Sequence, residues 1–392
     1  MIHAESPFNL SSNRRIVPYR LVVMEDLRMP ILAYASHLSA RPGDHVDIMV
    51  SSDRPYTAEL VHLAASYSTA KPQGWDEPRV GDPIGSFPGR VQVAYPGSYL
   101  RVDHPPVMPS AWSVSCWVWP TIPADGRDQG LIAHNDSTNG WCLGLDVAGH
   151  PTFSSGATRV TLPTALAPRQ WVELRADISA TGITLHAHRA KRHWLPATDE
   201  QASTPGPVSP PATGCPLLVG AGAWDGDHAT AVFNGKIADP VLAAADGTII
   251  AAWNLAADPA GTNIPDSTGG GAAATVVNHP ARVLTSHLWD GTWHDWRSHP
   301  EHYTAIYFHD DDVDDHRWQS DFTITMPDLP SAIYAVRLRQ VNPDPADALS
   351  EEYVPIYVRP RRGTTRAKVA YLAPTNTYLA YANEQLFPRT DA

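Results

Sequence analysis

The segment Trp112-Ser-Val-Ser-Cys-Trp-Val-Trp119, which ends at Pro120, decides the fold of this chain. Residues of different polarity alternate along it, and a period of two is the pattern of a β-strand with one buried face. Similar short segments follow at Gly140–Leu145, Arg169–Ala176, Gly182–His188, Pro216–Gly220 and Phe233–Ala238. Short strands at this spacing, with turns between them, predict a sandwich of two antiparallel sheets. The Ser-, Thr- and Pro-rich segment Thr198–Pro211 is expected to be a solvated loop.

Further strand-like segments lie before and after the predicted sandwich and resemble one another in sequence pattern. Val46–Val50 and Tyr56–Leu63 precede it, and four segments follow it at Tyr303–Phe308, Asp321–Thr325, Ile333–Leu338 and Tyr353–Val358. Insertions are tolerated at loop tips, so we expect one immunoglobulin-like sandwich that is interrupted by the larger sandwich. The predicted fold class is therefore mainly β. The expected domains are an arm at 1–14, the split sandwich at 15–90 plus 280–362, and the inserted sandwich with a trailing loop at 91–279.

The last residues, 363–392, predict the start of an α/β domain. Lys368–Thr375 is a short apolar run closed by turn residues, as expected for a strand buried on both faces. Asn376–Asn383 then predicts a strand-to-helix corner that carries Tyr378 and Tyr381. One strand and a piece of helix cannot bury a face by themselves. We therefore expect the chemistry to require protein that follows these 392 residues.

Composition excludes several classes of function. The net charge of −12 argues against a general nucleic-acid surface, which needs a basic stripe. No apolar run reaches the roughly 18 residues of a membrane span, and the first residues lack the pattern of a signal peptide. The three cysteines show no metal-ligand spacing, so reduced thiols in a cytoplasmic protein are expected. The 37 prolines together with 13 tryptophans and 14 tyrosines favour loop-rich β-structure.

Three polar motifs have a structural and a functional interpretation. His309–His316 is rich in Asp and could bind a cation, but it lacks the Gly and Glu of an EF-hand loop, so an acidic solvated or partner-facing loop is favoured. The pair His186 and His188, with His193 nearby, could chelate zinc, but surface histidines are the favoured interpretation. Trp224–His228 resembles a turn.

Five of the tryptophans could form binding surfaces in this chain. They are Trp117, Trp119, Trp289, Trp293 and Trp296, and about half are expected to fill the cores of the sandwiches. The remainder could stack on sugars or contact a partner subunit. This possibility leaves open an alternative function, namely that of a carbohydrate-binding protein without enzymatic activity. A pure scaffold is a further alternative.

Two family resemblances are carried by specific motifs. The middle block resembles a laminin-G or concanavalin-like sandwich, through Trp112–Trp119, Gln170–Glu173 and Phe233–Ile237. The whole chain resembles the large (beta) subunit of N,N-dimethylformamidase, in its N-terminal half. The motifs that carry this resemblance are, in chain order, Ser39–Asp44, Ala305–Asp312, Asp321–Asp328, Ser331–Leu338 and, the most specific, Leu372–Asn383.

The dimethylformamidase resemblance implies hydrolysis of a formamide C–N bond, which gives formate and an amine, at a mononuclear iron held by two tyrosines and one glutamate. Phenolate and carboxylate are hard donors that suit Fe(III). The match of Tyr381-Ala-Asn383 to the family's corner favours Tyr381 as a ligand, with Tyr378 as the alternative; Glu384 does not match the family's glutamate. The implied partners are a small second subunit, further copies of the large subunit and a small amide substrate. By itself, this chain is expected to be inactive.

Overall fold

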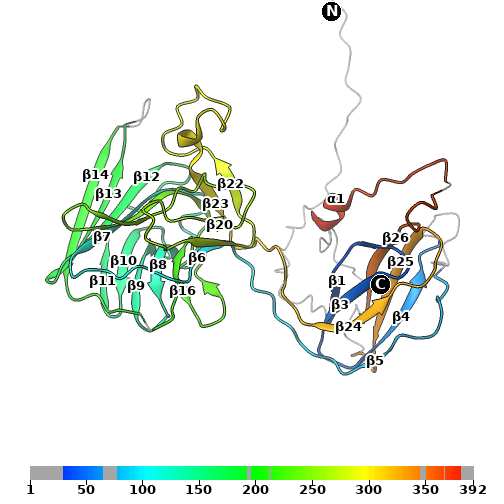
Figure 1. Ribbon diagram of the computed structural model, residues 1–392. Helices are drawn as coiled ribbons and strands as arrows, with labels where there is room; N and C mark the ends of the chain where they lie inside the picture. The colour runs from blue at the N-terminus through cyan, green and yellow to red at the C-terminus, as the bar shows by residue number, and fades with distance from the viewer. Residues whose placement is uncertain are drawn as a thin grey trace, which may run out of the picture. The chain divides into compact units, whose positions relative to one another are not determined.

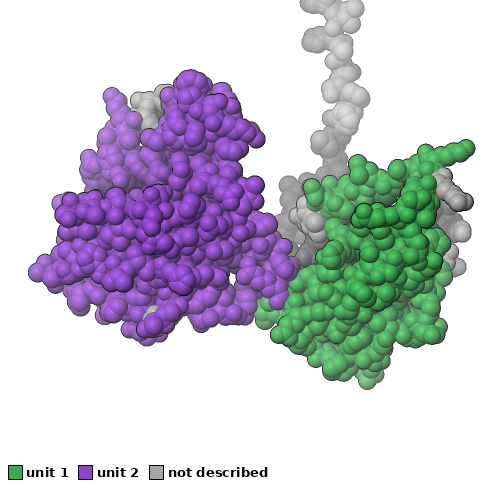
Figure 2. All heavy atoms as spheres, in the orientation of Figure 1, with its two compact units in different colours: residues 1–93, 318–392 green, residues 94–317 purple. Residues whose placement is uncertain are grey.

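The computed structural model describes residues 30–64, 77–191, 196–211, 213–344, 350–365 and 367–380. They fall into two compact units (Figures 1 and 2). Unit 2 is the continuous segment 94–317, and unit 1 combines residues 1–93 with residues 318–392. Unit 1 is therefore interrupted in sequence by unit 2. Almost all regular structure is β, as the sequence predicts. No helix in the described part of the chain is long and apolar enough to cross a membrane.

Unit 2 is a sandwich of two large sheets. In spatial order, the first sheet contains β11 (Thr158–Thr161), β10 (Pro151–Ser155), β9 (Gly140–Leu145), β8 (Gln129–Asn135), β15 (Leu217–Val219), β6 (Tyr99–Val102), β21 (Ala274–Val277) and β20 (Asn263–Ile264). The second contains β14 (Thr198–Pro205), β13 (Gly182–Arg189), β12 (Val172–Ile178), β7 (Trp112–Pro120), β18 (Gly235–Ala244), β23 (Ala305–Phe308) and β22 (Ala281–Leu284), with β19 (Ile249–Ala252) beside β18. All their pairings are antiparallel.

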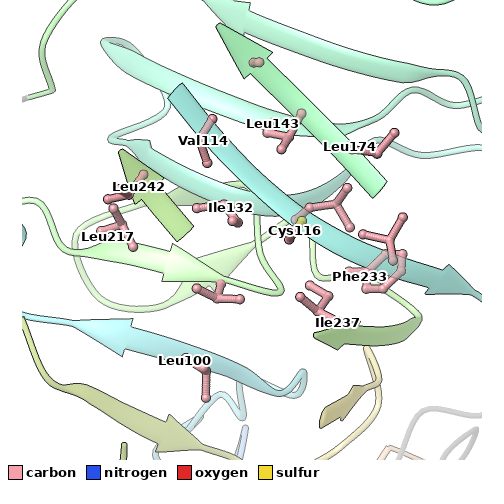
Figure 3. Packing of buried hydrophobic residues seen from close by; sticks show 14 of the residues in the cluster. Leu100, Val114, Cys116, Ile132, Leu143, Leu174, Leu217, Phe233, Ile237 and Leu242 are labelled. Atoms are coloured by element: carbon pink, nitrogen blue, oxygen red, sulfur yellow. The ribbon is translucent and has the colours of Figure 1, made fainter. Parts of the chain in front are cut away.

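The core of unit 2 follows from the alternation along β7. Val114, Cys116 and Val118 are buried, whereas the residues between them face outward. Figure 3 shows Val114 and Cys116 packed against residues of the opposite sheet, among them Leu143 and Ile132. Burial of each such aliphatic side chain contributes about 1.5–3 kcal/mol. The sheet thus presents an apolar inner face and a polar, aromatic outer face.

Unit 1 is a smaller two-layer sandwich of the immunoglobulin-like kind. One sheet has the order β1 (Ile31–Ala35), β3 (His45–Ser52) and β24 (Ser320–Thr325), and the other has the order β2 (Ser39–Ala40), β26 (Glu351–Val358), β25 (Ala332–Gln340), β4 (Tyr56–His62) and β5 (Gly85–Phe87). The pair β2 and β26 is parallel, and the other pairs are antiparallel. Ile48 from one sheet and Val336 and Ile356 from the other share its core.

The boundary between the two sandwiches differs from the sequence-based expectation. The sequence pattern places Tyr303–Phe308 in the immunoglobulin-like sandwich, but its strand β23 pairs with β18 of unit 2, with Ile306 opposite Ile237. The expected boundary after residue 279 therefore moves to residue 317. Alternating polarity predicts a strand but not its partner, which tertiary packing selects. This is the physical reason for the error.

The structure of residues 198–205 also differs from the sequence-based expectation. The composition of this segment predicts a solvated loop, but it forms the edge strand β14. Its side chains are exposed or half-buried throughout. An edge strand with one neighbour needs few apolar residues, so its Ser- and Thr-rich composition suits both a loop and this strand.

Candidate functional site

The predicted iron-ligand segment contains a short helix. Helix α1 spans Thr375–Ala380 and begins directly after Pro374. The Thr375 N–H donates to the Ala373 carbonyl (2.9 Å), and the Thr377 N–H donates to that of Pro374 (3.0 Å). Tyr378 lies in α1, whereas Tyr381 and Glu384 lie outside the described residues. A helix is thus present where the corner was predicted, and neither tyrosine is tested as a ligand.

The strand expected before this helix is not formed. Residues 368–373 have no regular structure, and the side chains of Val369, Tyr371 and Leu372 are 84%, 68% and 92% exposed. A strand needs a neighbour for its backbone hydrogen bonds and a layer to cover its apolar side chains. Among the described strands, none pairs with this segment. The prediction of a strand buried on both faces is therefore wrong.

The iron site that the family resemblance implies has hard oxygen donors, namely two phenolates and a carboxylate. Within the described residues, two groups of His, Asp or Glu are close enough to bind a metal, at 299–302 and at 309–311, and both lie in unit 2. Neither contains the two phenols that the family resemblance implies. These groups therefore do not fit the iron site, and the prediction of iron stays with Tyr381 or, alternatively, Tyr378.

The predicted histidine pair lies on the outer face of unit 2. Cross-strand pairing brings Asp199, His188, Glu173 and Trp117 into one row across β14, β13, β12 and β7. The first three residues of this row, together with His186 from the row beside it, border an open hollow of about 520 Å³. The arrangement gives the face a high density of titratable side chains.

These two histidines do not form a shared chelate. His186 Nε2 lies 3.1 Å from Asp177 Oδ2, and His188 Nδ1 lies 2.6 Å from Asp199 Oδ1. Each imidazole therefore has its own carboxylate partner, and the two do not converge on one point. His193, the third residue of the proposed group, lies outside the described residues. The favoured interpretation, surface histidines, agrees with this arrangement.

The outward tryptophans are partly covered by cations and imidazoles. The Trp117 ring stacks on His287, with centroids 4.1 Å apart and planes at 3°, and Lys236 Nζ lies 4.8 Å from the Trp119 ring centroid. None of the five tryptophans singled out in the sequence is fully buried, so the expectation that half of them fill the cores is wrong. At least one face of Trp117 and of Trp119 is taken by the protein itself, which reduces the area left for a stacked sugar.

The acidic segment at 309–316 is tied to the sandwich at several points. The Arg127 guanidinium contacts Asp310 (2.7 Å) and also Asp125 (2.6 Å), and the Ser98 hydroxyl donates to Asp312 Oδ2 (2.7 Å). Burial raises the pKa of Asp312, and the hydrogen bond from Ser98 opposes that shift. Two of the carboxylates, those of Asp310 and Asp312, thus hold the segment in place, while Asp311 is largely exposed and contacts His309 Nδ1. The loop is only in part the solvated one expected.

The motif at 224–228 forms the predicted turn. It joins β16 (Ala223–Trp224) to β17 (Ala229–Thr230) in a small hairpin. Asp225 Oδ1 accepts hydrogen bonds from the backbone N–H groups of Asp227 (3.1 Å) and His228 (3.0 Å). These bonds lower the pKa of Asp225, with the His228 amide as the largest cause. The carboxylate is therefore engaged in the turn itself.

The segment between β22 and β23, residues 285–304, carries a group of possible metal ligands that the sequence motifs do not indicate. Figure 1 shows it as a yellow loop beside these strands, and it contains the 3₁₀ helix η2 (Pro300–Tyr303). His299, Glu301 and His302 lie close together there. The sequence signal is His-Pro-Glu-His at 299–302, in which the two histidines are three residues apart.

Together, the two sandwiches and the tyrosine-bearing helix define a two-unit β-sandwich protein with a helix after its last strand. Residues 281–387 match the family model described as N,N-dimethylformamidase beta subunit-like, C-terminal. The chain is 33% identical to the N,N-dimethylformamidase beta subunit of Paracoccus aminophilus and 29% identical to that of an Alcaligenes species. Each match covers 92% of this chain and 53% of the relative.

The chain is therefore related to the dimethylformamidase beta subunits, which confirms the resemblance seen in the sequence. It spans about half the length of the curated relatives it matches. Among solved structures, the LG1-3 region of the laminin alpha2 chain is similar, with 10% identity and a TM-score of 0.30 over 66% of this chain and 56% of that one. A similarity this slight carries no argument about this chain.

Proposed function

We propose that this chain forms the β-sandwich part of a dimethylformamidase-like amidohydrolase. The observation that supports the proposal most strongly is 33% identity to a dimethylformamidase beta subunit along 92% of this chain. The reaction would be hydrolysis of the C–N bond of a small formamide, which yields formate and an amine. Because this chain spans half the length of its relatives, the activity is assigned to the assembled enzyme and not to these residues alone.

The role proposed for the C-terminal segment is to supply one iron ligand. The phenol oxygen of Tyr381 would bind the metal as phenolate, with Tyr378 as the alternative donor. Free phenols have a pKa of about 10, so a bound cation is needed to hold the deprotonated form at neutral pH. When bound, a mononuclear Fe(III) would polarise the amide carbonyl and activate water. The match to the family model includes both tyrosines.

Partners are the second part of the proposal. The relatives are named as beta subunits, which supports assembly with a different, small subunit and with further copies of this chain. The two sandwiches would provide the surfaces for this assembly. We place the protein in the cytoplasm, because Cys116, Cys142 and Cys215 are unbridged and reduced thiols are typical of that compartment.

Iron content and formate release test the proposal. Both are measured for the untagged chain alone and for the native assembly that contains it. We expect iron and formate release from N,N-dimethylformamide in the assembly, and neither in the chain alone. An assembly that is free of iron and inactive on formamides would contradict the proposal. If the chain instead binds glycans and loses that binding when residues 94–317 are removed, the carbohydrate-binding alternative is correct.

A further inference from the structure

The segment between β22 and β23 holds two imidazoles and a carboxylate at metal-binding separations. His299 Nδ1 lies 3.1 Å from Glu301 Oε1, and His302 Nε2 lies 4.0 Å from the same oxygen. The three ligand atoms all lie within 4.8 Å of one another. His299 is the residue directly before η2, and His302 lies within this helix. Because residues three apart are eclipsed along a 3₁₀ helix, the two histidines lie one above the other.

These separations suit a tetrahedral zinc ion. Zinc binds imidazole nitrogen and carboxylate oxygen at about 2.0–2.2 Å, so two ligands at a tetrahedral angle lie roughly 3.3 Å apart. The separations of Glu301 Oε1 from the two nitrogens, 3.1 Å and 4.0 Å, lie on either side of this value. We propose that His299, Glu301 and His302 form a zinc site on the outer part of unit 2. It is separate from the iron proposed for the C-terminal segment.

The second nitrogen of His302 is held as in metal-bound histidines. His302 Nδ1 lies 3.0 Å from the carbonyl oxygen of Leu288. A carbonyl can only accept, so Nδ1 carries the proton in the neutral ring and Nε2 offers its lone pair toward Glu301. An imidazole oriented by a backbone carbonyl is the usual outer contact of a histidine that binds a metal. This contact both fixes the ring and selects the nitrogen that faces the ion.

The backbone around the three ligands is fixed by hydrogen bonds. The carbonyl of Trp293 accepts from Trp289 Nε1 and from the Tyr303 hydroxyl, both at 2.8 Å. The Ser286 N–H donates to the carbonyl of His302 (2.8 Å) and the Ser286 hydroxyl to that of Glu301 (3.3 Å). The ligand-bearing turn is therefore anchored at both ends. A fixed backbone lowers the entropic cost of ordering the ligands around an ion.

The environment of the ligands is partly shielded and leaves one side open. The Trp293 ring stacks on His299, with centroids 3.7 Å apart, and the side chains of His299 and His302 are 28% and 16% exposed. Glu301 also lines a hollow of about 380 Å³ with Pro300 and Thr304. Three protein ligands beside an open space leave a fourth position for water.

The other acidic group in unit 2 is a weaker candidate. His309, Asp310 and Asp311 also lie within reach of one another, but the Asp310 carboxylate is neutralised by Arg127 at 2.7 Å. A cation placed there would have to displace or repel this guanidinium. The group at 299–302 has no such competing charge within ion-pair distance among the contacts described. His309 therefore serves as an internal control.

Zinc binding by the untagged 392-residue chain tests the proposal. Metal content after dialysis against zinc gives the stoichiometry, and competition with a chromophoric chelator gives the affinity. We expect one zinc ion per chain at this site. Removal of an outer contact of a metal ligand typically costs about 10–100-fold in affinity, so loss of a ligand in His299→Ala or His302→Ala should weaken binding by at least about 100-fold.

Matched variants make the result specific. His294→Ala, in the same segment but outside the group, and His309→Ala should bind zinc like the parent chain. Glu301→Gln, at an exposed position that does not endanger folding, should weaken binding by at least about tenfold. Absence of zinc from the parent chain, unchanged affinity in His302→Ala and Glu301→Gln, or loss of binding in His309→Ala would each overturn the proposal. None of these results depends on iron or on formamide hydrolysis.

Discussion

At the scale of single residues, the cation Arg337 links two carboxylates inside unit 1. Its Nε lies 2.9 Å from Glu59 Oε1, and its Nη1 lies 3.1 Å from Glu77 Oε2. The Tyr353 hydroxyl also donates to Glu77, at 2.9 Å. All three charged side chains are largely buried. This network joins β4 and β25 to the segment that precedes β5.

Replacement of this cation should destabilise unit 1. Arg337→Met leaves two buried carboxylates without their partner, and loss of one member of a buried pair costs about 3–5 kcal/mol. Arg361→Met, also in unit 1, is the control, because the exposed pair of Arg361 with Asp328 is worth about 0–1 kcal/mol. Urea denaturation measures both. Equal losses in the two variants would refute the buried network.

A second residue, Asp266, gives a prediction on pH. Its Oδ1 accepts hydrogen bonds from the Thr268 hydroxyl (2.8 Å), the Thr268 N–H (3.0 Å) and the Ala252 N–H (3.3 Å). Burial raises the pKa of Asp266, but these hydrogen bonds outweigh burial and leave the pKa below its usual value. The stabilisation is therefore present above the unfolded pKa of about 3.9 and is lost as the pH falls through the folded pKa.

Asp266→Asn should lower the free energy of unfolding at neutral pH, by about 1–3 kcal/mol for hydrogen bonds to a charged group. The difference between the variant and the parent chain should shrink as the pH falls below about 4, the unfolded pKa, towards the lower folded pKa of Asp266. Denaturation midpoints measured from neutral to acidic pH follow this change. A difference that stays constant over the whole range would show that the charge of Asp266 is not the cause.

At the scale of elements, β23 is the strand whose sandwich the sequence did not reveal. The buried Ile306 packs in the core of unit 2. Ile306→Ala should destabilise unit 2 by about 2–5 kcal/mol and should speed hydrogen exchange in β18 and β7. Val336→Ala, in the core of unit 1, is the control for the other unit. It should speed hydrogen exchange in β4 and β26, the neighbours of its strand β25. If Ile306→Ala loosened β4 and β26 instead, the assignment of β23 to unit 2 would be wrong.

The sequence predicts most strands of both sandwiches, because alternation such as that of Trp112–Trp119 reports directly on a half-buried strand. It does not predict which strands become neighbours, and for this reason the expected sandwich of β23 differs from the observed one. The edge strand β14 (Thr198–Pro205) has almost no apolar residues, and its side chains are exposed or half-buried. Its sequence therefore lacks the apolar alternation that would predict a strand. The proposed zinc-ligand group is not predictable from periodicity, because one turn of 3₁₀ helix has none, and only the spacing of the two histidines at 299 and 302 indicates it.

At the scale of the whole molecule, unit 2 is inserted into unit 1 at a point where the flanking segments of unit 1 meet. Gln92 Nε2 donates to the Gln319 carbonyl (3.0 Å), and the Gln319 N–H donates back to Gln92 Oε1 (2.8 Å). Arg90 Nη1 also donates to Gln319 Oε1 (2.8 Å). The two ends of unit 1 that flank the insertion are therefore adjacent within unit 1 itself.

This adjacency predicts that unit 1 folds without unit 2. A chain in which residues 94–317 are replaced by a short glycine-rich linker should keep a cooperative unfolding transition and the near-ultraviolet signal of its buried Tyr56 and Tyr334. Insertions at such exposed junctions are tolerated because few contacts depend on them. Gln319→Ala in the shortened chain should weaken the junction. A non-cooperative transition in the linker variant would indicate that unit 1 depends on unit 2.

The central proposal is that Tyr381 supplies a phenolate ligand to an iron site at which the assembled enzyme cleaves formamides. The most direct measurement compares iron content, phenolate-to-iron absorption in the visible range and formate release in native assemblies that contain Tyr381→Phe or Tyr378→Phe. We predict that Tyr381→Phe loses all three signals, whereas Tyr378→Phe keeps its iron and the absorption band. Full iron content, an unchanged band and unchanged formate release in Tyr381→Phe would contradict the claim.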